Sequence, residues 1–288
     1  MKKVGFIGAG VMGASMIRSL IKNGFEVVFY SRNRQKTAAT EADGAVWVST
    51  AAEAARGRDA VITIVGMPSD VEEVYFGETG ILENADPGTL VIDMTTSSPK
   101  LAQKIYEAAA ARGLSALDAP VSGGDTGARA GTLSIMVGGD PESFEAALPL
   151  FKAMGTNIIH EGPAGAGQHT KMANQIAIAG CIAGVAEAIA YSEKAGLDTQ
   201  KMFDSISAGA AGSWQLTNNG AHMLKDEFDP GFYIKHFIKD MRIAVEEADS
   251  RHLDLKITRD VLNMYVKLLD EGQGDLGTQA IIKYYRQQ

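Results

Sequence analysis

The stretch Val4-Gly5-Phe6-Ile7-Gly8-Ala9-Gly10-Val11-Met12-Gly13 decides the fold of this chain. Its first residues, Val4–Ile7, form a short apolar run that predicts a buried strand. The apolar positions of Val11–Asn23 recur at helical spacing, and Gly24 supplies the signal that ends the helix. A strand, a glycine-rich turn and a helix therefore follow one another at the N-terminus, as they do at the start of a parallel sheet covered by helices.

The glycines of this turn fit the pattern G-x-G-x-x-G at the point where the strand ends and the helix begins. In this setting Gly8 permits the tight turn, Gly10 lets backbone amides approach a pyrophosphate, and Gly13 allows the helix to pack closely on the sheet. The positive end of the helix dipole favours the negative charge of such a ligand. The pattern predicts a dinucleotide site formed by Gly8, Ala9, Gly10, Val11, Met12 and Gly13. A strand, turn and helix without any ligand is the alternative.

The rest of the first half repeats this alternation of apolar runs and helical patterns. Strands are expected at 4–7, 27–30, 61–65, 90–92, around 117, at 133–137 and at 157–159, with helices at 11–23, 34–42, 101–111 and 141–154. After Gly162-Pro163 the pattern changes, and only helices are expected, at 168–195, 199–207, 214–224, 234–250, 258–271 and 278–285. The predicted fold is α/β: an N-terminal Rossmann-type doubly wound sheet, residues 1–164, followed by an all-helical C-terminal domain, residues 165–288, joined by a long interdomain helix.

The end of the second strand indicates which dinucleotide is bound. NAD sites commonly place Asp or Glu there, about 20 residues after the glycines, to bind the ribose 2′-hydroxyl. This chain has Ser31-Arg32-Asn33 instead, in which Ser31 can donate a hydrogen bond and Arg32 can bind a 2′-phosphate. We therefore favour NADP, while NAD stays possible; a solvated surface arginine is the alternative interpretation. Val65 and Met67, at the end of the third expected strand, are also assigned to the cofactor site.

Lys171 is the candidate catalytic residue. It lies in the first turns of the long predicted helix, just after the domain boundary, where it can face a nicotinamide. Burial and the positive end of a helix dipole both lower the pKa of a lysine, so such a side chain can shuttle a proton or stay charged and polarise a carbonyl. Asn174 and Gln175 follow at helical spacing and share its face of the helix. The alternative is an ordinary surface lysine.

A second candidate region, Asp118-Ala119-Pro120-Val121-Ser122-Gly123-Gly124, follows a strand end, at the rim where α/β sheets bind ligands. Ser122 and the backbone amides of Gly123 and Gly124 can bind a carboxylate, because glycine lets amide groups converge. Thr96, after another strand, is placed to contact cofactor or substrate. An ordinary Ser-Gly-Gly loop is the alternative.

Composition argues against several other functions. The net charge of −8 and the pI near 5.2 disfavour binding to nucleic acid or to an anionic membrane, because both need a basic face. The single cysteine, Cys181, excludes an internal disulfide framework and fits a reducing compartment. No segment reaches the roughly 20 uninterrupted apolar residues of a membrane span, the nearest being 176–186, so we expect a cytoplasmic protein. The histidines have no metal-ligand spacing, and Trp214 is expected to lie in the core.

Four blocks of sequence together resemble the β-hydroxyacid dehydrogenase family, which includes 3-hydroxyisobutyrate dehydrogenases, tartronate semialdehyde reductases and glyoxylate/succinic semialdehyde reductases. The blocks span nearly the whole chain and are Gly5–Gly13, Asp118–Gly124 with its continuation to Gly139, Gly165–Gln175, and Phe232 with Ile238-Lys239-Asp240. The resemblance implies a fold like that of 6-phosphogluconate dehydrogenase.

The same resemblance implies functions for individual residues. Lys171 matches the catalytic lysine of the family, and Ser122, Gly123 and Gly124 match its carboxylate binders. Thr96 and Lys239 are implied to lie beside the nicotinamide, and Phe232 belongs to a block that closes over the cofactor.

The chain departs from many members of this family at Gln175, where they carry asparagine. The pair Asn174-Gln175 is similar to the tartronate semialdehyde reductases, whereas Ser31-Arg32-Asn33 is similar to the NADP-preferring semialdehyde reductases. Asn174 and Gln175 are both expected to contact substrate, and the two similarities do not select one substrate.

These observations predict reversible hydride transfer between NADP(H) and a short β- or γ-hydroxy acid or its semialdehyde, with Lys171 as the catalytic lysine and no metal. The partners expected are this small-molecule substrate and further copies of the chain, as a homodimer or homotetramer. Two alternatives stay open. One is an imine reductase-like or decarboxylating relative on the same fold, against which Lys171 counts. The other is a non-catalytic NADP-binding sensor.

Overall fold

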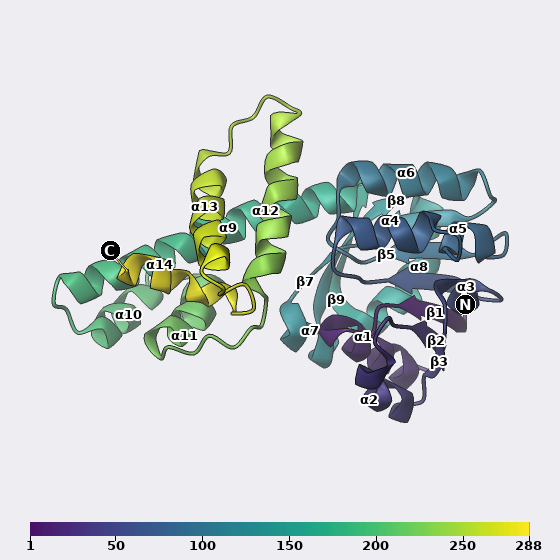
Figure 1. Cartoon of the computed structure of the whole chain (residues 1–288), viewed down its shortest axis with the longest axis horizontal. Helices are drawn as coiled ribbons and strands as arrows, with labels where there is room; N and C mark the ends of the chain where they lie inside the picture. The colour runs from purple at the N-terminus through teal and green to yellow at the C-terminus, as the bar shows by residue number, and fades with distance from the viewer. Residues whose placement is uncertain (288) are drawn as a thin grey trace. The chain divides into compact units, whose positions relative to one another are not determined.

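The computed structural model describes residues 1–287, without the side chain of Lys36, and divides into two compact units. The first unit is Met1–Lys171 and the second begins at Met172, so the division falls inside one long helix, α9 (Ala166–Lys194). The boundary expected from the sequence, 164/165, comes just before this helix. Figure 1 follows the chain from the sheet of the first unit, in purple, blue and teal, to the helices of the second, mostly in green and yellow.

A nine-stranded sheet forms the centre of the first unit. Its strands are β1 (Lys3–Ile7), β2 (Glu26–Tyr30), β3 (Val46–Val48), β4 (Ala60–Thr63), β5 (Leu90–Asp93), β6 (Ser115–Asp118), β7 (Val121–Ser122), β8 (Leu133–Gly139) and β9 (Gly155–Gly162). Their order is β3-β2-β1-β4-β5-β6-β8-β7, with β9 paired to β8. Strands β1 to β6 pair in parallel, whereas β8 runs antiparallel to β6 and β7. The strand order reverses beside β1, and this switch point is where doubly wound sheets bind ligands.

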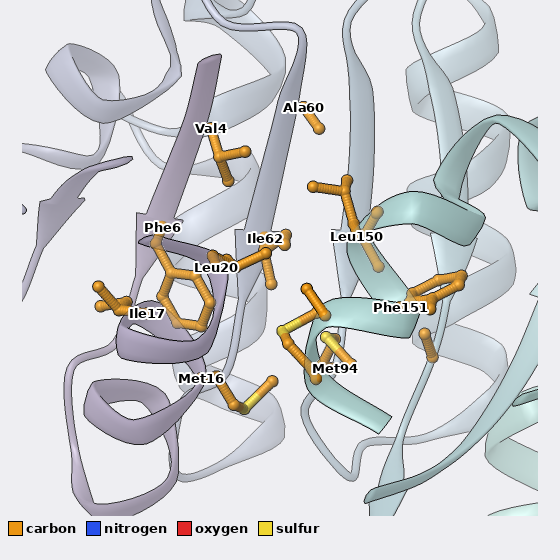
Figure 2. Close-up of a cluster of buried hydrophobic side chains, with 14 of the residues drawn as sticks. Val4, Phe6, Met16, Ile17, Leu20, Ala60, Ile62, Met94, Leu150 and Phe151 are labelled. Carbon is orange, nitrogen blue, oxygen red and sulfur yellow. The ribbon is translucent and has the colours of Figure 1, made fainter. Parts of the chain in front are cut away.

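Helices cover both faces of this sheet. They are α1 (Val11–Lys22), η1 (Arg34–Lys36), α2 (Ala38–Ala42), α3 (Ala51–Ala55), α4 (Pro68–Phe76), α5 (Ile81–Asn84), α6 (Pro99–Ala110), α7 (Gly124–Ala130), α8 (Pro141–Met154) and the start of α9. Side chains of α1 and α8 pack in one core cluster, whose members include Phe6, Leu20 and Phe151 (Figure 2). Side chains of α3 to α6 pack in a second cluster. Because Ile62 lies in the first cluster and Val61 in the second, β4 is buried on both faces, as its continuous apolar run predicts.

The sequence analysis missed several short elements of the first unit: β3, β7, α3, α4, α5 and α7. Strand β3 has only three residues and lies at the edge of the sheet, where Val46 is 61% exposed, so no alternating pattern marks it. Helix α3 begins where the Thr50 hydroxyl accepts the N–H of Glu53. A helix of five residues is too short to show a helical period, which is why only its cap distinguishes it.

The regular secondary structure of the second unit is helical in the residues that the structure describes, apart from an isolated bridge between Tyr233 and Gly277. It contains the rest of α9 and the helices α10 (Thr199–Ser207), η2 (Gln215–Gly220, π-helical), α11 (Ala221–Leu224), α12 (Ile234–Asp249), α13 (Lys256–Asp270), η3 (Thr278–Ile281) and α14 (Ile282–Arg286). The α/β fold class with a helical second part is therefore confirmed. Two expected helices, 214–224 and 278–285, are each divided into a non-α turn and a short α-helix.

The expectation that Trp214 lies in the core is wrong. Its side chain is 65% exposed at the N-cap of η2, whereas the next two residues, Gln215 and Leu216, are buried. Neighbouring residues of a helix point to different sides, so apolar character alone did not identify which of them faces inward.

Helix α9 is long and apolar enough, by length and composition, to cross a membrane, with a mean hydropathy of 1.5 in its most apolar window. Polar residues interrupt this helix, so the sequence shows no uninterrupted apolar run of membrane-spanning length there. The side chains of Ala179, Ile182, Ala186 and Ile189 on α9 are fully buried in the core cluster of the second unit. A helix that supplies the centre of a protein core has the same apolar composition.

Candidate functional site

Two glycines of the turn between β1 and α1 are required by the fold itself. Gly8 has a φ of +103°, and a Cβ there would lie 2.0 Å from the carbonyl oxygen of Ile64. A Cβ on Gly13 would lie 1.8 Å from the carbonyl oxygen of Gly8. A side chain at either position would push backbone segments apart that are in direct contact. The structure thus contains the tight turn and the close helix packing that the sequence assigned to Gly8 and Gly13.

Gly10 differs, because nothing lies within 4 Å of a Cβ built there, and its φ of −75° suits any residue. The space beside it opens at the N-terminus of α1, where no side chain caps the helix and no acidic residue occupies the first turn. Backbone N–H groups at such a helix start attract anions. The open space at Gly10 therefore fits a pyrophosphate, and the fold alone gives no other reason for glycine at this position.

The ends of five strands meet at the edge of the sheet beside this turn. In register, β1 pairs Ile7 with Tyr30 of β2 and with Thr63 of β4. The series continues from Thr63 to Asp93 of β5 and from Asp93 to Asp118 of β6. Residues that follow these ends gather at one edge, where doubly wound sheets bind ligands. The candidates that follow them are Ser31, Arg32, Val65, Met67, Thr96 and Ser122.

Arg32, two residues after the end of β2, forms an ion pair with Asp70 in the first turn of α4, with 2.9 Å between Nη1 and Oδ1. The other oxygen of Asp70 accepts the N–H of Met67 at 2.9 Å. The Arg32 side chain is 69% exposed, so water screens the pair and the guanidinium retains further donors for an anion. Asn33 instead accepts the N–H of Gln35 and caps the short helix η1.

A buried network of hydroxyl and carboxyl groups connects the ends of β4 and β5. Asp93 accepts the Thr63 hydroxyl at 2.8 Å and the N–H of Thr95 at 3.1 Å. The Thr95 hydroxyl oxygen accepts the N–H of Val65 at 3.0 Å. Burial raises the pKa of Asp93 to about 6, although hydrogen bonds from Thr95 and Thr63 oppose this rise. The segment that leads to Thr96 is therefore held to the neighbouring strand.

Asp118, the last residue of β6, holds the N-terminus of α9. Its two carboxylate oxygens accept the N–H of Gly165 at 2.7 Å and the N–H of Gln168 at 2.8 Å. Burial raises the pKa of Asp118, while these hydrogen bonds oppose the rise. A Cβ on Gly138 would lie 2.5 Å from Oδ1 of Asp118, so glycine there makes room for the carboxylate. This contact fixes the helix that carries Lys171 to the sheet.

The Gln168 side chain makes a second connection between α9 and the sheet edge. Its Oε1 accepts the N–H of Ser97 at 2.9 Å, and its Nε2 donates to the carbonyl oxygen of Thr95 at 2.7 Å. Gln168 is fully buried. The sequence analysis did not assign a function to Gln168 or Asp118, because their partners lie 47 to 73 residues away and no local spacing indicates such contacts.

Lys171 is 7% exposed and is therefore not the surface residue of the alternative interpretation. Ser122 lies half-buried in β7, which pairs with β8, and Gly123 and Gly124 follow at the start of α7. Both glycines have positive φ, +127° and +61°, which other residues rarely adopt. The loop conformation itself therefore accounts for glycine at these two positions.

In the second unit, Gln175, Asp240 and Lys239 form a buried polar chain. The carboxylate of Asp240 accepts Nε2 of Gln175 at 2.6 Å and lies 2.9 Å from the Lys239 ammonium. Oε1 of Gln175 accepts Nδ2 of Asn174 at 2.8 Å. Gln175 and Asp240 are almost fully buried, and Lys239 is 8% exposed. The structure thus brings together Asn174, Gln175 and Lys239, and it adds Asp240, to which the sequence analysis assigned no function of its own.

Phe232, the remaining candidate, is 37% exposed just before α12. Its ring stacks on His236 at a centroid distance of 6.5 Å and packs edge-on against Phe237. Among the described residues, no group of three or more His, Cys, Asp or Glu side chains could hold a metal ion.

The fold and this sheet edge are those of a dinucleotide-binding protein, and comparisons with known proteins identify it as a member of an oxidoreductase family. The family model for the NAD binding domain of 6-phosphogluconate dehydrogenase matches residues 3–162. The model for the NAD-binding region of NADP-dependent 3-hydroxyisobutyrate dehydrogenase matches residues 165–285.

Individual relatives agree with these models over almost their full length. An uncharacterized oxidoreductase of Bacillus subtilis is 53% identical, with 99% of each chain covered. The 2-hydroxy-3-oxopropionate reductase of Escherichia coli is 37% identical over 98% of this chain and 96% of its own. The structure of Mycobacterium tuberculosis 3-hydroxyisobutyrate dehydrogenase with L-serine superposes with a TM-score of 0.90 at 32% identity and 99% coverage of both chains. The chain belongs to the β-hydroxyacid dehydrogenase family, as its sequence blocks indicated, and this is a family of NAD(P)-dependent hydroxyacid dehydrogenases.

Proposed function

We propose that this protein is an NADP(H)-dependent dehydrogenase that interconverts a short 3-hydroxy acid and its semialdehyde, with Lys171 as the catalytic residue. The burial of Lys171 carries this proposal. A lysine side chain is almost never buried without a reason, and a buried ammonium near a reacting oxygen can move a proton. The alternative of a non-catalytic NADP-binding sensor gives no reason to bury a lysine at this position.

The proposed substrate class is supported by what the names of the relatives share. 3-Hydroxyisobutyrate, L-serine and 2-hydroxy-3-oxopropionate each carry a carboxylate at C1 and an oxygen at C3. They differ at C2, which bears a methyl, an ammonium or a hydroxyl group. We propose a substrate with this three-carbon frame and a small C2 substituent, whose carboxylate is bound by Ser122 and the amides of Gly123 and Gly124. This choice sets aside the γ-hydroxy acids that the sequence left open.

Each residue then has a chemical step. A bound nicotinamide supplies a hydride to the C3 carbonyl carbon, or accepts one from the alcohol. Lys171 donates a proton to the C3 oxygen during reduction and accepts it back during oxidation. Burial of Lys171 limits access of water to this proton. The amides at Ser122, Gly123 and Gly124 hold the carboxylate so that C3 stays in place.

Within the second unit, we propose that Asn174 contacts the substrate and that Gln175 orients it. Both ends of the Gln175 amide already have partners, Asp240 and Asn174. The oxygen of the Asn174 amide is not used in that contact, and Asn174 is only half-buried. Glutamine in place of the asparagine of many relatives therefore transfers the substrate contact to the preceding residue.

The residues proposed to bind the cofactor are Gly8–Gly13, Ser31, Arg32, Val65, Met67 and Thr96. For Phe232 and Lys239, a contact with the cofactor is proposed from the family resemblance of their sequence block. NADP(H) is favoured because Arg32 replaces the acid of NAD sites. The contact with Asp70 moderates this preference, since a 2′-phosphate would lie near that carboxylate.

A substrate screen tests the proposal directly. NADPH and NADH oxidation would be followed with methylmalonate semialdehyde, tartronate semialdehyde, succinic semialdehyde and glyoxylate. Turnover is expected with the first two. Turnover of succinic semialdehyde or glyoxylate alone would contradict the three-carbon frame, and absence of turnover with all four while NADPH still binds would favour the sensor.

We also propose that the protein is cytoplasmic and forms a homodimer or homotetramer. Large apolar side chains on the second unit support self-association, since Tyr191, Trp214 and Ile257 are each at least 65% exposed. Light scattering of the purified protein measures the oligomeric state, and a monomer at micromolar concentration would contradict this expectation.

A further inference from the structure

Gln168 buries an amide side chain completely and uses both of its ends on one short segment of backbone. Oε1 accepts the N–H of Ser97, and Nε2 donates to the carbonyl oxygen of Thr95, at 2.9 and 2.7 Å. The residue between these two partners is Thr96. The amide thus pairs with Thr95 and Ser97 as a neighbouring strand would, and it defines the backbone position of Thr96.

The same residue is also fixed at its backbone. The N–H of Gln168 donates to Oδ2 of Asp118 at 2.8 Å, and Gly165 donates to the other oxygen of that carboxylate. Gln168 lies one turn before Lys171 on α9. One side chain therefore connects the segment of Thr96 to the helical turn that leads to the buried lysine.

Asp93 and Val65 hold this segment at Thr95, before Thr96, whereas Ser97 follows Thr96. The Ser97 hydroxyl is buried without a hydrogen-bond partner among the described residues, so it does not hold the loop. Immobilising a glutamine side chain costs about 1.5–2 kcal/mol of conformational entropy. Two backbone hydrogen bonds to a single amide offset such a cost only in one relative arrangement of loop and helix.

We infer that Gln168 is a positioning residue that sets Thr96 at a fixed distance from Lys171, an inference that rests on the proposed function of this site. Its loss leaves the glycine turn and the carboxylate binders in place, and shifts Thr96, with the cofactor that it contacts, relative to the proton donor Lys171. Rates of oriented reactions are sensitive to such shifts, and a displacement of about 1 Å can lower them about a hundredfold. The effect therefore falls on kcat more than on KM.

Two substitutions separate positioning from simple packing. Gln168→Met keeps the length of the side chain and removes both hydrogen bonds at every pH. In Gln168→Glu, the protonated carboxyl can still accept from Ser97 and donate to Thr95, whereas the ionised form places negative charge against the Thr95 carbonyl oxygen. Burial and the nearby carboxyl groups of Asp118 and Asp93 raise the pKa of the introduced carboxyl, while His169 and Lys171 oppose this rise when charged.

The measurement is kcat and KM from pH 5 to 9, expressed relative to the wild type at each pH. Gln168→Met is expected to have about tenfold to a hundredfold lower kcat at all pH values. Gln168→Glu is expected to be equally impaired at pH 8 and to recover to within about threefold of the wild type as the pH falls. Gln200→Glu, an exposed glutamine on α10 that donates to Asp204, is the matched control and should remain near the wild type throughout. Wild-type kcat in both Gln168 variants, or a ratio for Gln168→Glu that does not change with pH, overturns the inference.

Hydrogen exchange of the Ser97 amide in the cofactor-free protein tests the same contact without any activity. Faster exchange in Gln168→Met, with an unchanged rate in Gln200→Met, supports the inference. Unchanged exchange in Gln168→Met overturns it, whether or not the wild type turns over a hydroxy acid. A wild type without turnover would instead refute the proposed function and leave the exchange result as the test of Gln168.

Discussion

Two glutamines on α9 use both ends of their side-chain amides, but they do so in different ways. Gln168, in the first unit, binds backbone groups only, at Ser97 and Thr95. Gln175, in the second unit, binds side chains only, because it donates to Asp240 and accepts from Asn174. Both are buried, Gln168 completely and Gln175 with 2% exposure.

The difference shows two ways of building a rigid polar site. Backbone partners carry no net charge, so the first arrangement depends on the shape and donor pattern of the amide. The second arrangement ends at a buried ion pair, with 2.9 Å between the Lys239 ammonium and the Asp240 carboxylate, so it depends on charge. Buried charges are strongly destabilising when their partner is removed, whereas a neutral amide can be replaced at smaller cost. We therefore expect catalytic effects from the first network and large stability effects from the second.

The largest effect is expected at Lys171, which lies between the two glutamines in the sequence. Lys171→Ala removes the proton donor and should lower kcat by about 10²–10⁴-fold, while NADPH binding, measured by fluorescence titration, stays nearly unchanged. If Gln168 acts through Lys171, adding Gln168→Met to Lys171→Ala should lower kcat little further. Wild-type turnover in Lys171→Ala would show that the catalytic assignment is wrong.

Asp240→Asn tests the charged network. It keeps the shape of the side chain but leaves the buried Lys239 ammonium beside a neutral amide, which should cost about 3–5 kcal/mol of unfolding free energy. Urea unfolding followed by circular dichroism measures this loss. The control is Asp275→Asn, which breaks the exposed pair with Lys235 and should leave the unfolding free energy nearly unchanged. Equal losses of unfolding free energy in Asp240→Asn and Asp275→Asn would contradict the large stability effect expected from the buried charged network.

The pH dependence of stability tests the region next to the backbone network, where Asp93 accepts the N–H of Thr95. The pKa of Asp93 is raised to about 6 in the folded state, so the folded protein binds more protons than the unfolded chain between about pH 4 and 6. The free energy by which Asp93 stabilises the folded state is therefore fully present below about pH 4. It is lost as the pH rises through 6, and the loss is at most about 3 kcal/mol.

The side chain introduced by Asp93→Asn resembles the protonated carboxyl of Asp93 and does not ionise. The variant should therefore not lose stability as the pH rises through 6. The unfolding free energy of the variant relative to the wild type should therefore rise between pH 4 and 7. A difference that is constant with pH would contradict the shifted pKa. The control is Asp43→Asn, which alters a part-buried pair with Arg18.

The smallest effect is expected at Arg32, which belongs to neither network. Arg32→Ala should weaken NADPH binding about tenfold through loss of a charge-assisted contact to the 2′-phosphate, and should leave NADH binding nearly unchanged. Arg34→Ala, which removes a cation stacked 4.2 Å over Trp47, is the control for general loss of positive charge. Equal losses for both cofactors in Arg32→Ala would refute the preference for NADP.

The glycine turn and the strands around it could be predicted from the sequence alone. The glycine turn, the buried strands and the break between a sheet and a helical part follow from residue order and periodicity, because each depends on neighbours in the chain. The structure then showed that Gly8 and Gly13 serve the fold, whereas Gly10 leaves open space that a ligand can use. Pattern matching treats the three glycines alike, and only the surrounding backbone distinguishes them.

Non-local contacts account for what the sequence did not indicate. The residues around Asp118 indicate only a loop after a strand, yet its carboxylate holds the start of α9, 47 and 50 residues later. Trp214 was expected in the core because it is large and apolar, yet its neighbours Gln215 and Leu216 take the buried positions. Burial is a property of the assembled unit, and no single residue type determines it.

The sequence by itself determined the dinucleotide turn, the fold class, the family and the identity of Lys171 as the candidate base, since these depend on short motifs and their order. The tertiary structure decided which groups hold these motifs in place. Gln168 forms hydrogen bonds with the backbone on either side of Thr96, and Asp240 accepts a hydrogen bond from Gln175. The physical reason is that a hydrogen bond requires two groups within about 3 Å in the right orientation. Chain order does not specify that distance for residues far apart in the sequence, but the packed sheet and helices do.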